Sequence, residues 1–210
     1  MIIAVDGPAA AGKGTLARRM AAALGLPYLD TGLLYRAVGR LVLDEGFDPR
    51  DAVYALEAAR ALQPRDLARG DLRGPVADMA ASAVAAIPTV REELLEFQRR
   101  FGRERGAVMD GRDIGTVVFP DADAKFFVTA LPEERARRRH AELLGRGEGA
   151  EFAHVLSEIR ARDAQDENRP VAPLRPAEDA MLLDTTALDA DAAFAAAMAL
   201  IETRRPSHAV

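Results

Sequence analysis

Short apolar runs alternate along the chain with longer segments in which apolar residues recur every three or four positions. The short runs are typical of strands that are buried on both faces, and the longer segments are typical of helices. The predicted strands are residues 2–6, 27–30, 107–110, 124–129 and 180–184. The predicted helices are residues 14–24, 33–43, 50–62, 75–86, 89–104, 132–145, 151–166 and 189–204. Strands that alternate with helices predict an α/β fold, a parallel five-stranded sheet flanked by helices.

Two segments interrupt this alternation. Residues 47–87 predict a helical insertion, because residues 55–74 contain no valine, isoleucine or threonine, the residues that favour strands. Residues 145–150 are rich in glycine and separate two helices that carry arginines. Such a hinge suits a lid that closes over a bound ligand.

The composition argues against nucleic-acid binding, a metal site with cysteine ligands and a membrane span. The chain has 210 residues, 49% of them hydrophobic, which is enough for a substantial core in one or two domains. A net charge of −5 argues against broad binding to nucleic acid. With no cysteine and three scattered histidines, any metal is expected on oxygen ligands. The longest apolar run, residues 192–201, is too short to span a membrane, and nothing marks export, so we expect a cytoplasmic protein.

A glycine-rich segment follows the first predicted strand and opens the first helix. Residues 7–15 read Gly-Pro-Ala-Ala-Ala-Gly-Lys-Gly-Thr, which matches the phosphate-binding pattern G-x4-G-K, with the hydroxyl residue one place later than usual. The glycines let successive N–H groups point into one concavity, the helix adds its positive end, and Lys13, on an exposed loop, reaches the β- and γ-phosphates. We therefore predict that a nucleoside triphosphate binds Gly7, Pro8, Ala9, Ala10, Ala11, Gly12, Lys13, Gly14 and Thr15, with Thr15 also a candidate ligand of Mg²⁺.

Two features that are missing from the sequence argue against hydrolysis of the γ-phosphate. Lys125, the only lysine outside the loop, follows Ala124, so the Asn-Lys-x-Asp reader of guanine is missing and a GTPase is excluded. Asp110 is followed by Gly111, where a water-activating ATPase usually has glutamate. Of the 28 basic residues all but Lys13 and Lys125 are arginine, a residue suited to anions. Transfer to a second, anionic substrate is the remaining prediction.

At this point the chain resembles the nucleoside monophosphate kinases, and most closely their bacterial cytidylate kinase branch. The resemblance spans nearly the whole chain and is carried by five blocks. They are residues 6–15; residues 29–32 with Tyr35 and Arg36; residues 80–92; the run Asp110-Gly111-Arg112-Asp113-Ile114-Gly115-Thr116-Val117-Val118-Phe119-Pro120; and residues 162–173. The fourth block is the most specific of the five.

The resemblance implies transfer of the γ-phosphoryl group of MgATP to CMP or dCMP by a monomer of the P-loop NTPase type. It assigns Lys13, Arg112 and Arg169 to catalysis, and Thr15 and Asp110 to Mg²⁺, through the nucleotide and water. For CMP it assigns Arg36, Arg112 and Arg169 to the phosphate, Ser82, Arg91 and Asp113 to the base, and Arg162 and Asp166 to the sugar. Thr31 joins this CMP-binding set. No nucleic acid and no membrane are expected among the partners.

The resemblance also implies one domain over residues 1–210. Its core would be residues 1–46, 88–144 and 167–210, with a monophosphate-binding insertion at about 47–87 and a lid at about 145–166. The family carries a small antiparallel sheet in the insertion, for which residues 55–74 are too poor in strand-forming residues. We expect the arginines at 135 and 137–139 on a solvated helix face, with one or two of them reaching ATP when the lid closes.

Two alternatives remain open from the residues alone. One is a kinase for another small anionic acceptor, such as UMP, shikimate or a coenzyme precursor. The other is a regulatory protein that binds a nucleotide without turnover, for which the arginines would be surplus.

Overall fold

The computed structural model describes residues 1–204, except for the side chain of residue 204. The chain forms two compact units. The first unit is Met1–Leu29 with Arg105–Val210, and the second is Asp30–Glu104. The segment expected as an insertion, residues 47–87, falls inside the second unit. Among the described residues, no helix is both long enough and apolar enough to cross a membrane.

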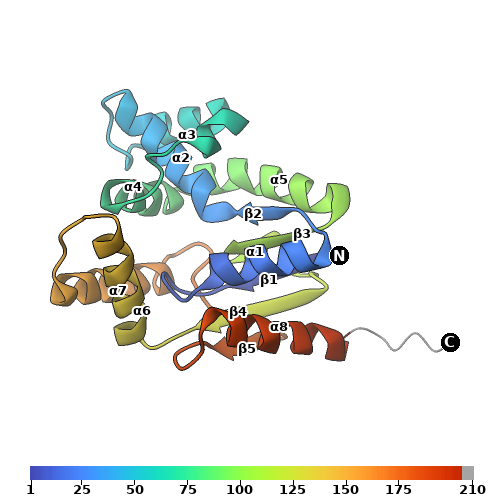
Figure 1. The fold of residues 1–210 in the computed structure, drawn as a ribbon. Coiled ribbons are helices and arrows are strands. Elements are labelled where there is room, and N and C mark those ends of the chain that lie inside the picture. Colours follow the sequence, from blue (N-terminus) through green and yellow to red (C-terminus); the bar gives the residue numbers. More distant parts are fainter. Residues whose placement is uncertain (205–210) are drawn as a thin grey trace. The chain divides into compact units, whose positions relative to one another are not determined.

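A five-stranded sheet in the described residues has the order β2-β3-β1-β4-β5 (Figure 1). Its strands are β1 (Ile2–Asp6), β2 (Tyr28–Asp30), β3 (Ala107–Gly111), β4 (Ala124–Thr129) and β5 (Met181–Asp184). Strand β1 pairs in parallel with β3 and β4, and β4 pairs in parallel with β5. The predicted parallel α/β sheet is therefore confirmed. Because the strands run in one direction, their carboxyl ends meet at one edge, where ligands of such sheets bind.

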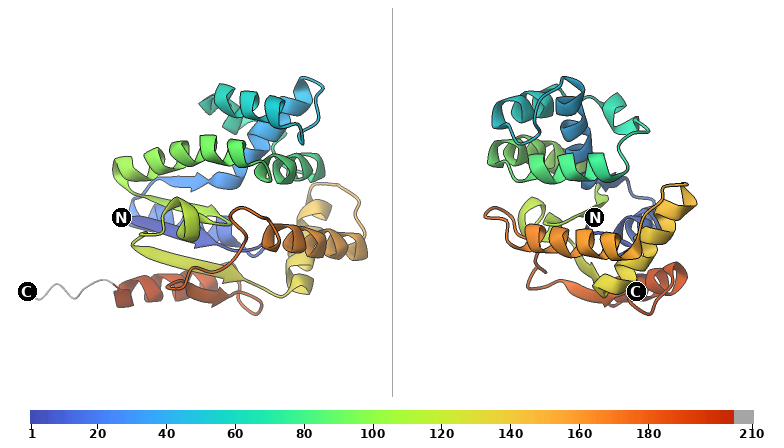
Figure 2. Two further views of the ribbon diagram at one scale, coloured as in Figure 1. Left: turned by 180° about the vertical axis from the view of Figure 1, so that it is seen from behind. Right: turned by 90° about the vertical axis from the view of Figure 1, so that its left-hand side faces the viewer.

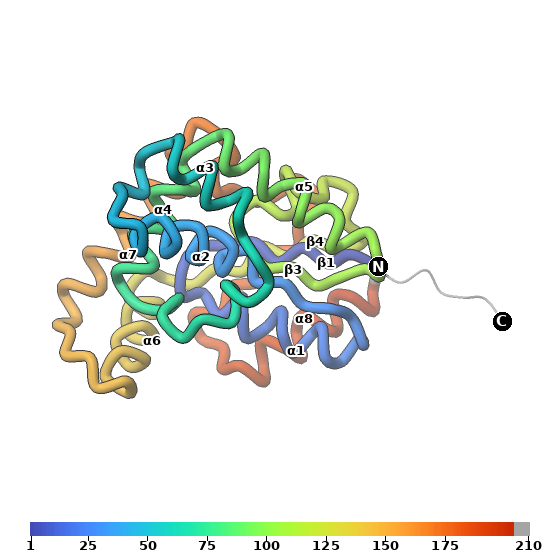
Figure 3. Tube along the Cα trace, turned by 90° about the horizontal axis from the view of Figure 1, so that it is seen from above, coloured from blue at the N-terminus to red at the C-terminus, as the bar shows by residue number. Residues whose placement is uncertain are grey.

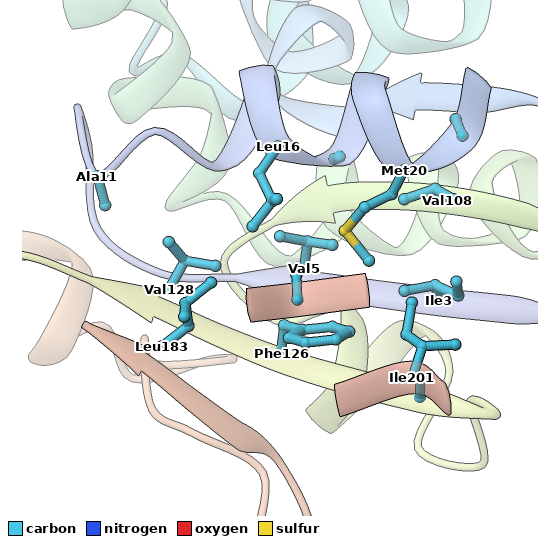
Figure 4. Close-up of a cluster of buried hydrophobic side chains, with 14 residues drawn as sticks. Ile3, Val5, Ala11, Leu16, Met20, Val108, Phe126, Val128, Leu183 and Ile201 are labelled. Atoms are coloured by element: carbon cyan, nitrogen blue, oxygen red, sulfur yellow. The ribbon is translucent and has the colours of Figure 1, made fainter. Parts of the chain in front are cut away.

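One face of the sheet is covered by α1 (Lys13–Leu24) and α8 (Ala190–Arg204), which lie side by side (Figures 1 and 3). Leu16 and Met20 of α1 and Ile201 of α8 pack there against buried side chains of the strands (Figure 4). Val5 and Phe126 lie at the centre of this cluster. The two helices bury their apolar stripes against this face of the strands.

The first unit also contains a helical hairpin of α6 (Pro132–Gly145) and α7 (Phe152–Glu167) (Figure 2). The two helices share a small apolar cluster of Ala136, Leu143, Val155 and Ile159. The loop between them contains most of the predicted hinge. A π-helical turn, Ile114–Val118, follows β3 and is an element that the apolar pattern did not predict.

The second unit is helical. It contains α2 (Thr31–Asp44), α3 (Ala52–Ala61), a 3₁₀ helix at Pro64–Ala68, α4 (Pro75–Ala85) and most of α5 (Pro88–Arg105). Residues 55–74 contain no strand, as predicted. Asp30 accepts a hydrogen bond from the N–H of Leu33 at 3.3 Å, so it caps the start of α2.

Candidate active site

The glycine-rich loop lies between β1 and α1, at the carboxyl edge of the sheet. Gly7 has a φ of 147°, and a Cβ there would collide with the carbonyl oxygen of Val128. Gly12 has a φ of 88° and precedes the first residue of α1, Lys13. These two positions require glycine because other residues rarely adopt such backbone angles. The loop thus turns back on itself to open a helix, the context that phosphate binding requires.

The Lys13 ammonium group lies within this loop. Its Nζ donates a hydrogen bond to the carbonyl oxygen of Pro8 at 2.8 Å, and the residue is only 6% exposed. Lys13 was predicted to lie on an exposed loop, but its side chain is buried. The reason is that the loop wraps around its own lysine, which a linear pattern does not reveal.

Asp110 and the first turn of α1 lie close together. The pairing of β1 with β3 sets Asp110 level with Val5, so both side chains point to the face that α1 covers. Oδ1 of Asp110 accepts a hydrogen bond from the Tyr28 hydroxyl at 2.7 Å, and a Cβ on Gly14 would lie 3.7 Å from its Oδ2. The Asp110 carboxylate thus lies beside the first turn of α1. The exposed Thr15 follows in the same turn.

Asp6 is a buried carboxylate that was not among the predicted site residues. Its Oδ1 accepts a hydrogen bond from the N–H of Ile114 at 2.8 Å, and its Oδ2 accepts one from the N–H of Gly115 at 2.7 Å. Burial raises the pKa of Asp6 to about 7, although these two backbone donors oppose the rise. Asp6 thus fixes the π-helical turn that directly follows Arg112 and Asp113. A polar residue that ends an otherwise apolar strand was the available signal.

Three predicted acceptor arginines surround one carboxylate in the first unit. Nε of Arg112 donates to Oδ2 of Asp166 at 2.8 Å, and a nitrogen of Arg169 lies 4.0 Å from Oδ1. Burial acts to raise the pKa of Asp166, but the guanidinium groups of Arg112, Arg162 and Arg169 outweigh it and hold this pKa below its ordinary value. Asp166 is therefore ionised at neutral pH. Positive charge exceeds negative charge in this cluster, which suits a phosphate dianion.

Asp113, predicted to read the base, is 7% exposed and immediately precedes the π-helical turn. Nε of its neighbour Arg112 donates to Asp166. The strand register places Asp113 just beyond the carboxyl end of β3, in the same unit as the phosphate-binding loop.

The remaining predicted acceptor residues belong to the second unit. Arg36 on α2 donates from its Nε to Asp78 at 3.0 Å. The Arg91 guanidinium on α5 lies over the Tyr35 ring, 5.7 Å from its centroid, and donates to the carbonyl oxygen of Ala85 at 3.3 Å. Tyr35 thus packs under an arginine. Thr31 is buried at the start of α2, and Ser82 is half-buried on α4.

The arginines of α6 do not share one environment. Arg137 is exposed and pairs with Glu134, and Arg139 pairs with Glu142 at 3.0 Å. Arg138 donates to the hydroxyl of Thr185 at 3.0 Å and to its carbonyl oxygen at 2.6 Å. Arg135 is only 3% exposed, so the prediction of a solvated face is wrong for this residue. The reason is that Arg135 binds Asp163 on α7 and the carbonyl oxygen of Ala9, partners that lie far away in the chain.

Comparison with known proteins decides the family. The model of the family described as cytidylate kinase matches residues 3–203. The chain belongs to the cytidylate kinase family. The cytidylate kinase of Acidiphilium cryptum (strain JF-5) is 60% identical over 201 residues, which cover 96% of this chain and 95% of the relative. That of Methylocella silvestris (strain DSM 15510 / CIP 108128 / LMG 27833 / NCIMB 13906 / BL2) is 58% identical over 208 residues, covering 99% and 96%.

A solved structure supports the fold of this member of the cytidylate kinase family. An uncharacterized protein from Eubacterium ventriosum ATCC 27560 superposes with a TM-score of 0.59, over 97% of this chain and 99% of that chain. Its sequence identity of 13% limits the likeness to the fold. As a member of the cytidylate kinase family, the chain is a kinase, a transferase that acts on nucleotides with ATP. A regulatory protein without turnover is therefore set aside.

Proposed function

We propose that the chain transfers the γ-phosphoryl group of MgATP to CMP or dCMP, giving ADP and CDP or dCDP. The observation that carries this proposal is the cluster of Arg112, Arg162 and Arg169 around Asp166, in the same unit as the phosphate-binding loop. A donor loop and a separate, positively charged acceptor cluster are what phosphoryl transfer between two anionic nucleotides requires.

The donor triphosphate would lie on residues 7–15. Successive N–H groups of the loop and the start of α1 bind its phosphates, and Lys13 exchanges the Pro8 carbonyl for a phosphate oxygen. In this way the lysine follows the charge that develops on the transferred group.

The residues beside the loop fit a magnesium ion. The Asp110 carboxylate and the Thr15 hydroxyl offer oxygen atoms, the ligands that Mg²⁺ prefers, at the first turn of α1. In residues 1–204, no group of three acidic or histidine side chains could hold a metal by itself. Such a donor set suits an ion carried by the nucleotide and its waters. When bound, Mg²⁺ neutralises charge on the β- and γ-phosphates.

The acceptor monophosphate would bind Arg36, Arg112 and Arg169, whose planar guanidinium groups match phosphate oxygens. Asp166, held ionised by its arginine neighbours, accepts hydrogen bonds from sugar hydroxyls, as Arg162 donates them. A phosphate oxygen of the acceptor attacks the γ-phosphorus as the bond to the β-phosphate oxygen breaks, and ADP leaves. No side-chain nucleophile takes part, so catalysis consists of positioning and neutralisation of charge.

The base of the acceptor would be read by Ser82, Arg91 and Asp113, with Thr31 nearby in the acceptor set. Cytosine presents an amino donor beside acceptors on its ring nitrogen and carbonyl. A carboxylate on the amino group, with arginine and serine on the acceptors, is complementary to this pattern. In UMP the amino donor is replaced by a carbonyl acceptor, and the ring nitrogen becomes a donor.

An assay of ADP production across monophosphates tests the proposal. CMP, dCMP, UMP, AMP and GMP are offered with MgATP, together with shikimate as an acceptor of another class. We expect turnover with CMP and dCMP at a kcat/KM well above that for every other acceptor. Preference for another acceptor, or ADP production that is the same without any acceptor, would contradict the proposal.

We propose further that the protein acts as a monomer in the cytoplasm, without nucleic acid or membrane. The net charge of −5 supports the expectation about nucleic acid. Light scattering during size-exclusion chromatography measures the molar mass, and a dimer mass at micromolar concentration would contradict the monomer.

A further inference from the structure

Arg135 is a buried arginine that joins three parts of the first unit. It lies in the first turn of α6, and its Nε donates to the carbonyl oxygen of Ala130 at 2.9 Å. Two guanidinium nitrogens bind the two carboxylate oxygens of Asp163 on α7, at 2.9 and 2.6 Å. One of these nitrogens also donates to the carbonyl oxygen of Ala9 at 3.2 Å. This fork fixes both distance and orientation between its partners.

One end of this arrangement lies on the phosphate-binding loop. Ala9 belongs to the loop, and its neighbour Ala10 has a φ of 58°, an angle that residues other than glycine adopt at a cost. Ala10 packs against the apolar cluster shared by α6 and α7. The loop is therefore attached to the helical hairpin twice, by the hydrogen bond from Arg135 and by the Ala10 methyl group.

The other end lies on the face of α7 that carries acceptor residues. Asp163 precedes Asp166 by three positions, so the two carboxylates lie on neighbouring parts of one helix face. Asp166 binds Arg112 at 2.8 Å, and Arg162 is the neighbour of Asp163 in the chain. A movement of Asp163 would therefore move the acceptor cluster.

We propose that Arg135 and Asp163 are positioning residues that set the register between the phosphate-binding loop and the acceptor-binding face of α7. The inference rests on the proposed function, since it assumes that the loop holds the donor and that Arg112, Arg162 and Arg169 hold the acceptor. Neither residue takes part in the chemical step. Their task is the alignment of the γ-phosphate with the attacking oxygen, a geometry in which a displacement of about 1 Å can cost about 10²-fold in rate.

The chain offers a matched control for this pair. Arg160 on α7 binds Glu133 on α6 at 2.6 Å, and both side chains are largely exposed. This second ion pair joins the same two helices but touches neither the loop nor the acceptor cluster. Arg135→Lys keeps the charge and loses the fork. Arg160→Lys makes the same substitution at a pair in which one guanidinium nitrogen binds one carboxylate oxygen. Asp163→Asn removes the charge from the other end and keeps the shape.

The test measures kcat, both KM values and thermal unfolding for the parent, Arg135→Lys, Asp163→Asn and Arg160→Lys. The acceptor is the monophosphate that the parent phosphorylates best, so a failure of the proposed CMP specificity does not affect the comparison. At a temperature at which circular dichroism shows every chain folded, we expect kcat to fall about tenfold or more in Arg135→Lys and Asp163→Asn, with KM for ATP within about threefold. Arg160→Lys should keep the parental kcat.

Three results would overturn the proposal. In the first, folded Arg135→Lys and Asp163→Asn keep kcat within about twofold of the parent. In the second, Arg160→Lys loses as much kcat as Arg135→Lys. In the third, both variants of the pair are unfolded where Arg160→Lys is native, because the pair would then hold the fold and not the reacting groups.

Discussion

At the scale of single residues, the two lysines differ in their tasks from the many arginines. Lys13 binds the Pro8 carbonyl inside the loop, and Lys125 donates to the carbonyl oxygen of Pro120 and to Asp179. A Cβ on Gly115 would lie 3.1 Å from the Cδ of Lys125, so this stem runs through a narrow space. At both positions a compact ammonium group binds a backbone carbonyl oxygen, a contact that needs one point charge and no planar fork.

Lys13→Met is expected to remove catalysis while keeping the fold. Methionine fills the buried space of the stem but supplies no charge to the transferred group, so kcat should fall by about 10²- to 10³-fold or more. The free energy of unfolding, measured in urea, should change by no more than about 1.5 kcal/mol, the usual net value of one hydrogen bond. Arg103→Met on the exposed face of α5 is the control. Activity of Lys13→Met within tenfold of the parent would contradict the role of the loop.

The raised pKa of Asp6 predicts that the free energy of unfolding depends on pH. Its pKa is raised by burial from 3.8 in the unfolded chain to about 7 in the folded one, so the folded state binds the proton more tightly. Its stabilising effect is complete below pH 4 and is lost as the pH rises to 7. Relative to Asp6→Asn, the parent's free energy of unfolding should fall by about 1.4 kcal/mol per pH unit in this window. Urea unfolding at pH 5, 6 and 7 measures this, and parallel profiles for the two chains would contradict it.

At the scale of elements, the alternation of side chains along β1 and β3 decides which face of the sheet the carboxylates of Asp6 and Asp110 point to. Val5 is level with Asp110 and Asp6 is level with Gly111, so Asp110 points toward α1 and Asp6 points to the opposite face, toward the π-helical turn. A shift of the register by one residue would exchange these faces. The end of β3 therefore contributes Asp110 to the candidate magnesium site. The end of β1 contributes Asp6, which supports the backbone beyond Arg112 and Asp113.

Close packing of α2 against α4 depends on one glycine. A Cβ at Gly39 would lie 2.7 Å from the Cβ of Ala80 and 2.8 Å from its carbonyl carbon. Gly39→Ala is therefore expected to lower the free energy of unfolding by about 1–3 kcal/mol, the usual cost of overpacking, even though alanine favours helices. Gly70→Ala, where a Cβ would meet nothing within 4 Å, is the control. Equal urea midpoints for the two variants would contradict this packing argument.

At the scale of the whole molecule, charge is distributed unevenly. The net charge is −5, yet the described residues of the first unit gather three guanidinium groups around the single carboxylate of Asp166. Such a local excess attracts a phosphate against the field of the remaining surface, and its effect weakens with salt. The acceptor set predicted from the sequence is divided between two compact units, so the proposed specificity is a property of the complete chain.

Base specificity is the prediction at this scale. In UMP the amino donor becomes a carbonyl and the ring nitrogen carries a proton, so Asp113 and Arg91 would both face groups of the wrong kind. Unpaired buried polar groups cost about 1–3 kcal/mol each, which predicts a kcat/KM for CMP about 10²- to 10⁴-fold above that for UMP. Asp113→Asn should narrow this gap, chiefly by loss of activity on CMP. Equal kcat/KM values of the parent for CMP and UMP would contradict the base-reading set and leave the kinase activity intact.

The sequence alone predicted the succession of strands and helices along the chain, the parallel sheet and the phosphate-binding loop, and it carried the family resemblance. These features are local, since apolar periodicity and the spacing of Gly7, Gly12 and Lys13 depend on near neighbours in the chain. The absence of strands from residues 55–74 was predictable from their composition for the same reason.

Tertiary structure decided what depends on residues far apart in the chain. The burial of Lys13 and Arg135, the support of the π-helical turn by Asp6, and the gathering of arginines around Asp166 all come from contacts that helical or strand periodicity does not encode. Arg135 and Arg137 are alike as sequence letters, and only α7 and the loop distinguish them. A charge is buried where folding brings its partner, because an unpaired charge would remain in water.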